Sequence, residues 1–168
     1  LGARLASSDD ALIADALTAL GAVPSFRPSI DAWHAVALRV GAELPTTHES
    51  LGVPTWRYGH EPPNVFATAI AKYVGNAVRE AVLLEVCNAG IVFLPGAAGT
   101  VQEVFQDACE NYYADESSIA PMVLVGHAYW TSVLPVWPLL ESLARGRPMA
   151  DRVHLADTVV DAAAIISG

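Results

Sequence analysis

The feature that most constrains how this chain folds is a short apolar run followed by glycines and a helix-like pattern. Residues 90–103 read GIVFLPGAAGTVQE. The continuous apolar run GIVFL is typical of a strand that is covered on both faces. Gly96 and Gly99 allow the backbone to turn sharply after it, and residues 99–113 then show helical periodicity. The segment therefore predicts a buried strand, a glycine-bearing loop and the start of a helix.

Strand and helix patterns alternate along the whole chain. Short apolar runs predict strands at 50–56, 90–94, 121–125 and 152–155. Helical periodicity predicts helices at 9–22, 29–40, 64–87, 99–113, 132–144 and 157–166. The alternation predicts an α/β fold, an open and mostly parallel sheet with helices on both faces in a Rossmann-like layout. Ligands of such sheets bind at the carboxyl ends of the strands.

Side chains that begin or end helices refine three of these ranges. Ser8 or Asp9 is expected to cap the first helix, and Gly41 is expected to end the second. Asn64 is expected to cap the third helix, which Gly75 can break. The ends of the predicted helices therefore rest on a few named residues.

Composition limits the size of the fold and the class of partner. The chain has 168 residues, of which 53% are hydrophobic, so one compact domain over residues 1–168 is expected. Its apolar runs are far shorter than the about 20 residues that cross a bilayer, and no membrane association is expected. The formal net charge of −9, with nine Lys plus Arg, argues against a nucleic-acid partner. A small anion can still bind at a helix terminus.

The cysteines and the first residues of the chain bear on its cellular location and on the length of the parent protein. Cys87 and Cys109 show no ligand spacing, so neither a zinc site nor a disulfide framework is indicated, and we expect a cytoplasmic protein. No signal-peptide pattern is found. The only methionines are Met122 and Met149. We therefore expect the parent protein to contain upstream sequence.

The loop PGAAGTVQE admits two interpretations. Glycines without side chains let a phosphate approach the amides of the first helical turn, and Glu103 would then place a carboxylate near the sugar of a nucleotide. Alternatively, Thr100 caps the helix and Glu103 completes a T-x-x-E capping box, which is purely structural. Spacing alone leaves both interpretations open.

Other nucleotide and hydrolase motifs are absent from the sequence. The chain contains no GxGxxG, GxxxxGK[ST] or GxSxG pattern. Lys72 is the only lysine, and nothing around it supports a Schiff-base enzyme. The glycine loop is thus the motif that carries the functional prediction.

PGAAGTVQE resembles the PGGxGTxxE signature of the Lonely Guy type phosphoribohydrolases and the related nucleotide 5'-monophosphate nucleosidases. The likeness covers roughly residues 25–130, including YGHEPPNVFATAIAKY. It implies hydrolysis of the N-glycosidic bond of a nucleoside 5'-monophosphate by a homodimer that uses no metal or other cofactor. It also implies that Arg79 and Glu103 form the catalytic pair, and that the phosphate binds to Gly96, Ala97, Ala98, Gly99 and Thr100.

The chain departs from this family pattern in two ways. Ala97 replaces the second glycine of the motif, which is tolerated only if this position keeps φ below zero. The family's first strand and its first glycine-rich loop should precede Leu1. The resemblance therefore implies that residues 1–168 contain only part of the nucleotide site.

Further polar and aromatic residues are weaker candidates. His60, Glu61 and Asn64 follow a predicted strand and can touch sugar or base, although hydrogen bonds within the loop are the simpler interpretation. Asp107 and Glu110 share a helical face with Glu103, and we expect that face to be solvated. Five aromatic residues are expected to serve packing and not the site: Tyr112, Tyr113, Tyr129, Trp130 and Trp137.

Two functions of other classes remain open. The protein can be a nucleotide sensor or carrier that binds without turnover, which Ala97 favours. It can also be an interaction domain whose apolar helices, notably in residues 66–84, dimerise while the loop has no ligand. Assay of ribose 5-phosphate release from several nucleotides separates these hypotheses.

Overall fold

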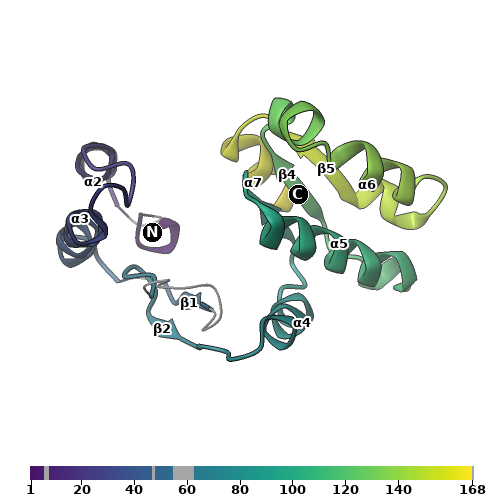
Figure 1. The fold of residues 1–168 in the computed structure, drawn as a ribbon, viewed down its shortest axis with the longest axis horizontal. Helices are drawn as coiled ribbons and strands as arrows, with labels where there is room; N and C mark the ends of the chain where they lie inside the picture. Colours follow the sequence, from purple (N-terminus) through teal and green to yellow (C-terminus); the bar gives the residue numbers. More distant parts are fainter. Residues whose placement is uncertain (6–7, 47, 55–62, 168) are drawn as a thin grey trace. The chain divides into compact units, whose positions relative to one another are not determined.

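The protein is an α/β protein with short parallel strands in two small open sheets. A computed structural model describes residues 1–5, 8–46, 48–54 and 63–167. The chain divides into two compact units, Leu1–Arg79 and Glu80–Gly168, whose elements Figure 1 labels. The expectation of a single domain stays a prediction.

The first unit contains helices and one pair of very short strands. Its helices are α1 (Gly2–Leu5), α2 (Asp10–Gly21) and α3 (Ile30–Glu43), and α4 (Asn76–Val86) begins within it. Strand β1 (Leu51–Gly52) pairs in parallel with β2 (Ala69–Ile70). The strand predicted at 50–56 is therefore two residues long in the described part of the chain, and its last two residues lie outside that part.

The start of α2 follows its predicted cap, whereas the end of α3 differs from the prediction. The Asp9 side chain accepts a hydrogen bond from the Leu12 amide at 2.8 Å, which confirms Asp9 as the cap of α2. The end predicted for α3 is wrong. Gly41 does not terminate the helix, which continues to Glu43, because Gly41 can also adopt ordinary helical geometry.

The prediction of a helix from Asn64 is also wrong. The Asn64 side-chain oxygen accepts a hydrogen bond from the Phe66 amide at 3.0 Å, which makes a turn instead of a helix cap. The chain then runs alongside residues 50–52, and the amides of Thr68 and Ala69 both donate to the Ser50 carbonyl. Pairing with a distant segment overrides the local helical pattern, so α4 begins only at Asn76.

A small apolar core holds the first unit together. Its buried members are Ala16, Ala37, Val40, Leu44 and Phe66. Arg4 of α1 makes two hydrogen bonds beside this core. Its guanidinium donates to the Phe66 carbonyl at 3.0 Å and to the Gly41 carbonyl at 2.8 Å. Arg4 thus connects α1 to α3 through Gly41 and to the segment before β2 through Phe66.

The second unit is a parallel sheet with the strand order β3-β4-β5. Its strands are β3 (Ile91–Phe93), β4 (Met122–Val125) and β5 (Val153–Ala156). Its helices are α5 (Ala98–Tyr113), the 3-10 helices η1 (Glu116–Ser118) and η3 (Pro148–Arg152), the π-helix η2 (Tyr129–Val133), α6 (Trp137–Ala144) and α7 (Val159–Ser167). The three strands predicted at 90–94, 121–125 and 152–155 are confirmed within one residue at each end.

Helices cover both faces of this sheet. Met122 and Leu124 of β4 lie in a core with residues of α5 and α6, whereas Val123 and Val125 pack with Ala162 of α7. In Figure 1, α6 lies next to β5, and α7 lies next to both β4 and β5. The alternation of β4 side chains between the two cores follows from the two-residue repeat of a strand. Among the residues that the structure describes, no helix is long and apolar enough to cross a membrane.

The helix predicted at 132–144 is interrupted. Residues 129–133 form the π-helix η2, in which the Leu134 amide donates to the Tyr129 carbonyl at 2.8 Å. Helix α6 begins only at Trp137, with Pro138 in its first turn. Proline has no amide hydrogen to donate within a helix, so Pro135 and Pro138 favour a break before the first turn of α6.

Gly90 precedes β3 with φ of +133°, and Gly90→Ala is expected to destabilise the protein. The new Cβ would lie 2.4 Å from Ile166 Cδ1 and 3.1 Å from the Pro121 carbonyl oxygen. We expect a loss of about 1–3 kcal/mol in the free energy of unfolding, measured by urea titration. The matched control is Gly99→Ala, whose Cβ meets nothing within 4 Å. Equal stability of the two variants would contradict the prediction.

Candidate functional site

The predicted phosphate loop joins β3 to α5 at the carboxyl edge of the sheet. Helix α5 begins at Ala98, and Ala97 is its N-cap residue with φ of −107°. The condition for accepting Ala97 in place of glycine is therefore met, since its φ is negative.

The predicted capping box is not formed. Thr100 lies within the first turn of α5, and the N-cap residue makes no side-chain hydrogen bond. Because α5 begins three residues earlier than the capping box requires, Thr100 is at the third helical position. Glu103 consequently lies in the second turn of α5. The structural alternative for Thr100 and Glu103 is thus wrong.

The first turn of α5 is an uncapped helix N-terminus. The amides of Ala98, Gly99 and Thr100 precede the first helical hydrogen bond, in which the Val101 amide donates to the Ala97 carbonyl. Ala97, Ala98 and Gly99 are exposed. Such a terminus carries partial positive charge and favours anions. It can accept a phosphate group without rearrangement of a cap.

Gly96 cannot carry a side chain in this loop. An added Cβ would lie 2.8 Å from Thr100 Cβ and still closer to the Thr100 hydroxyl oxygen. The Thr100 side chain thus folds back over Gly96. Packing against Thr100 therefore requires glycine at this position, whether or not a ligand binds.

Glu103 lines a small, mainly apolar cavity of about 200 Å³ in the second unit. The walls come from α4, the segment that follows it, β3 and α5: Glu80, Leu83, Leu84, Cys87, Ile91, Phe93 and Glu103. Glu103 is half-buried. A carboxylate at an apolar cavity is less screened than one in water, so its charge acts more strongly on a bound group.

Glu80 is a second carboxylate at this cavity, and sequence reasoning missed it. Its side chain is only 1% exposed and accepts a hydrogen bond from Gln102 Nε2 at 2.5 Å. Nothing in the pattern of residues 76–86 distinguishes this glutamate from Glu85, which is exposed. Its burial depends on the neighbouring helix α5, which spacing alone does not reveal.

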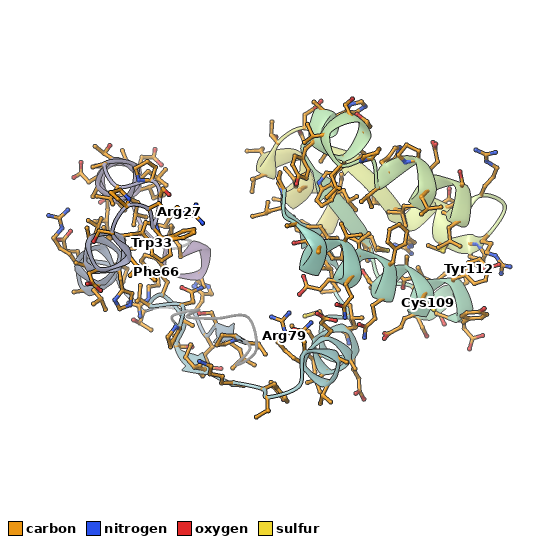
Figure 2. The ribbon with its side chains drawn as sticks, in the orientation of Figure 1. Arg27, Trp33, Phe66, Arg79, Cys109 and Tyr112 are labelled. Atoms are coloured by element: carbon orange, nitrogen blue, oxygen red, sulfur yellow. The ribbon has the colours of Figure 1, made fainter. Side chains whose placement is uncertain are left out.

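Arg79 lies near the start of α4, where Figure 2 labels it. Its guanidinium donates to the Val53 carbonyl at 3.3 Å, and the side chain is half-buried. Arg79 belongs to the first compact unit and Glu103 to the second. Their pairing as catalytic residues therefore stays a prediction.

Of the predicted substrate loop, only Asn64 lies within the described residues, since His60 and Glu61 fall outside them. Asn64 makes the loop hydrogen bond to the Phe66 amide, as its simpler interpretation predicted. It also lines a cavity of about 490 Å³ in the first unit, together with Trp33, His34 and Phe66; Figure 2 labels two of these side chains. This cavity is larger than the one at Glu103 but contains neither the glycine loop nor either predicted catalytic residue.

The predicted solvated face of α5 is wrong for Asp107. Its side chain is only 4% exposed, whereas Glu110 is exposed. Asn111 Nδ2 donates weakly to Asp107 Oδ1 at 3.5 Å, and Oδ2 has no hydrogen-bond partner among the described residues. Burial raises the pKa of the Asp107 carboxyl from 3.8 to about 7, and the Glu110 carboxylate adds to this rise. The carboxyl is therefore partly protonated at neutral pH.

No metal-binding cluster of three or more His, Cys, Asp or Glu side chains is found in the part of the chain that the structure describes. Neither a protein-family model nor a curated protein matches this chain.

Proposed function

We propose that the protein hydrolyses the N-glycosidic bond of a nucleoside 5'-monophosphate and releases the free base and ribose 5-phosphate. One observation carries the proposal: an exposed, uncapped helix N-terminus lies on the same helix as Glu103, which lines a cavity. The resemblance of PGAAGTVQE to the phosphoribohydrolase signature supports it. We also propose a Rossmann-like fold completed by upstream strands, a homodimer and a cytoplasmic location.

In this proposal, the first turn of α5 binds the phosphate. The amides of Ala98, Gly99 and Thr100 donate to its oxygens, and the positive end of the helix favours its charge. The Thr100 hydroxyl, which forms no hydrogen bond within the described residues, adds a fourth donor. Binding of the remote phosphate helps to hold the glycosidic bond in a reactive position.

Glu103 is the proposed catalytic carboxylate. The base leaves with the electron pair of the glycosidic bond, so positive charge develops on the ribose ring, and a nearby carboxylate stabilises it. Glu103 accepts a proton from the attacking water, whose oxygen forms the new bond to C1′, while the leaving base takes up a proton from solvent and Glu103 then returns its own proton to solvent. Arg79 is proposed to bind the phosphate, or to hold the base or Glu103 in place, a role that suits its planar, bidentate group.

The test is incubation of the full-length protein with AMP, GMP, CMP and IMP, followed by assay of ribose 5-phosphate. We expect release from at least one of the four. Saturable binding without release from any of them would reject the hydrolase and support the second candidate, a nucleotide carrier. That candidate is favoured by Ala97, whose methyl group stands at the N-cap of α5.

A further inference from the structure

The loop after β4 lies against the glycine loop after β3. The two strands are adjacent and parallel, with Phe93 opposite Leu124, so both loops emerge at the same edge of the sheet. Gly126 follows β4 with φ of +100°, and a Cβ there would lie 3.5 Å from Pro95 Cγ. Gly126 therefore lies within ordinary contact distance of the Pro95 ring, and the start of η2 lies beside Gly96.

Tyr129, the first residue of η2, is hydrogen-bonded to the glycine loop. Its hydroxyl donates to the Gly96 carbonyl oxygen at 2.5 Å. Its ring packs edge-on against Trp130, with centroids 5.0 Å apart and an interplanar angle of 89°. Trp130 is fully buried, and its indole nitrogen donates to the Val125 carbonyl at 2.9 Å. The Tyr129 ring thus packs on a side chain that belongs to the core of the second unit, and this contact fixes the position of the Tyr129 hydroxyl.

We propose that Tyr129 is a positioning residue that holds the Gly96–Ala97 peptide in the orientation needed to bind phosphate. In a trans peptide, the carbonyl and the following amide point in opposite directions. When Tyr129 holds the Gly96 carbonyl, it also directs the Ala97 amide away from the phenol and keeps a carbonyl oxygen from facing an anion. Gly96 makes this restraint necessary, because a residue without Cβ rotates its peptide easily.

The π-helix supports this assignment. A π-type turn adds one residue to the helical turn and is frequent at functional sites. Three residues separate the end of β4 from the start of the π-helix η2, and the Trp130 amide donates to the Gly126 carbonyl. Tyr129 and Trp130 are consecutive, so one side chain enters the core while its neighbour contacts the glycine loop.

This inference rests on the proposed function, because phosphate is the ligand that the loop is proposed to hold. The test compares Tyr129→Phe with wild type in calorimetric titrations with inorganic phosphate and with ribose 5-phosphate, neither of which depends on the base. The matched control is Tyr112→Phe, which also removes a hydrogen-bonded phenol hydroxyl, at the far end of α5; Figure 2 labels Tyr112. We expect about tenfold weaker binding in Tyr129→Phe and none of this loss in the control.

A second readout separates positioning from general stability. In wild type, the Ala97 amide resonance is expected to shift when phosphate is added, and in Tyr129→Phe this shift is reduced at equal saturation while the melting temperature changes little. Wild-type affinity in Tyr129→Phe, an equal loss in both variants, or no phosphate binding by wild type would each overturn the inference. If phosphate binding depends on Tyr129 but no nucleotide is hydrolysed, the hydrolase proposal fails and the positioning role stands.

Discussion

Asp107→Asn is expected to make the protein more stable at pH 8 by up to about 4 kcal/mol. The pKa of the Asp107 carboxyl rises from 3.8 to about 7 on folding. The folded state therefore binds its proton more tightly, and the cost of ionising the buried group grows as pH rises through this interval. Asparagine has the same shape as the protonated acid and carries no charge. The measurement is urea unfolding of variant and wild type at pH 4 and pH 8.

The difference between the two proteins isolates this carboxyl, because other titrating groups are common to both. We expect the two free energies of unfolding to be nearly equal at pH 4. The advantage of the variant should grow between pH 4 and pH 7 and stay constant above pH 7. Asp115→Asn, at an exposed position just after α5, is the control and should show no such pH dependence. An Asp107→Asn protein that is equally stable or less stable at pH 8 would contradict the account of a buried, poorly solvated carboxylate.

Helix starts and buried strands were predictable where a single local cause decides them. The Asp9 side chain bonds the first turn of α2, and an Asp before an apolar helical pattern predicts this. Strand β4 is buried on both faces, as its continuous apolar run predicted. In both cases, the residues that determine the element lie within it or next to it.

Residues 64–71 show where local patterns fail. Their helical periodicity is genuine, but Thr68 bonds to Ser50 through both its amide and its hydroxyl, and β2 pairs with β1. These partners are 18 residues away, and spacing cannot reveal them. Tertiary pairing commonly overrides weak intrinsic propensity.

The candidate site was predictable in outline, but not in its supporting contacts. The glycine loop and the position of Glu103 on the following helix were predicted, and so was the requirement for a negative φ at Ala97. Glu80, Asp107 and Tyr129 were missed or assigned to other roles, because burial and the hydrogen bond to Gly96 arise from elements that meet only in the fold.

Glu103→Gln is expected to lower the rate of nucleotide hydrolysis by about 10²- to 10⁴-fold. Glutamine keeps the size of the side chain in the cavity but has neither the charge that stabilises the developing cation nor the basicity to accept a proton from water. Binding of ribose 5-phosphate should change little, since the phosphate donors are in the first turn of α5. Glu110→Gln, on the same helix at an exposed position, is the matched control.

The most direct test of the account is the rate of ribose 5-phosphate release at saturating nucleotide, measured for wild type, Glu103→Gln and Glu110→Gln side by side. The account predicts release by wild type and Glu110→Gln at similar rates, and a loss of at least about a hundredfold in Glu103→Gln. Release by Glu103→Gln at the wild-type rate would contradict the assignment of Glu103 as the catalytic carboxylate.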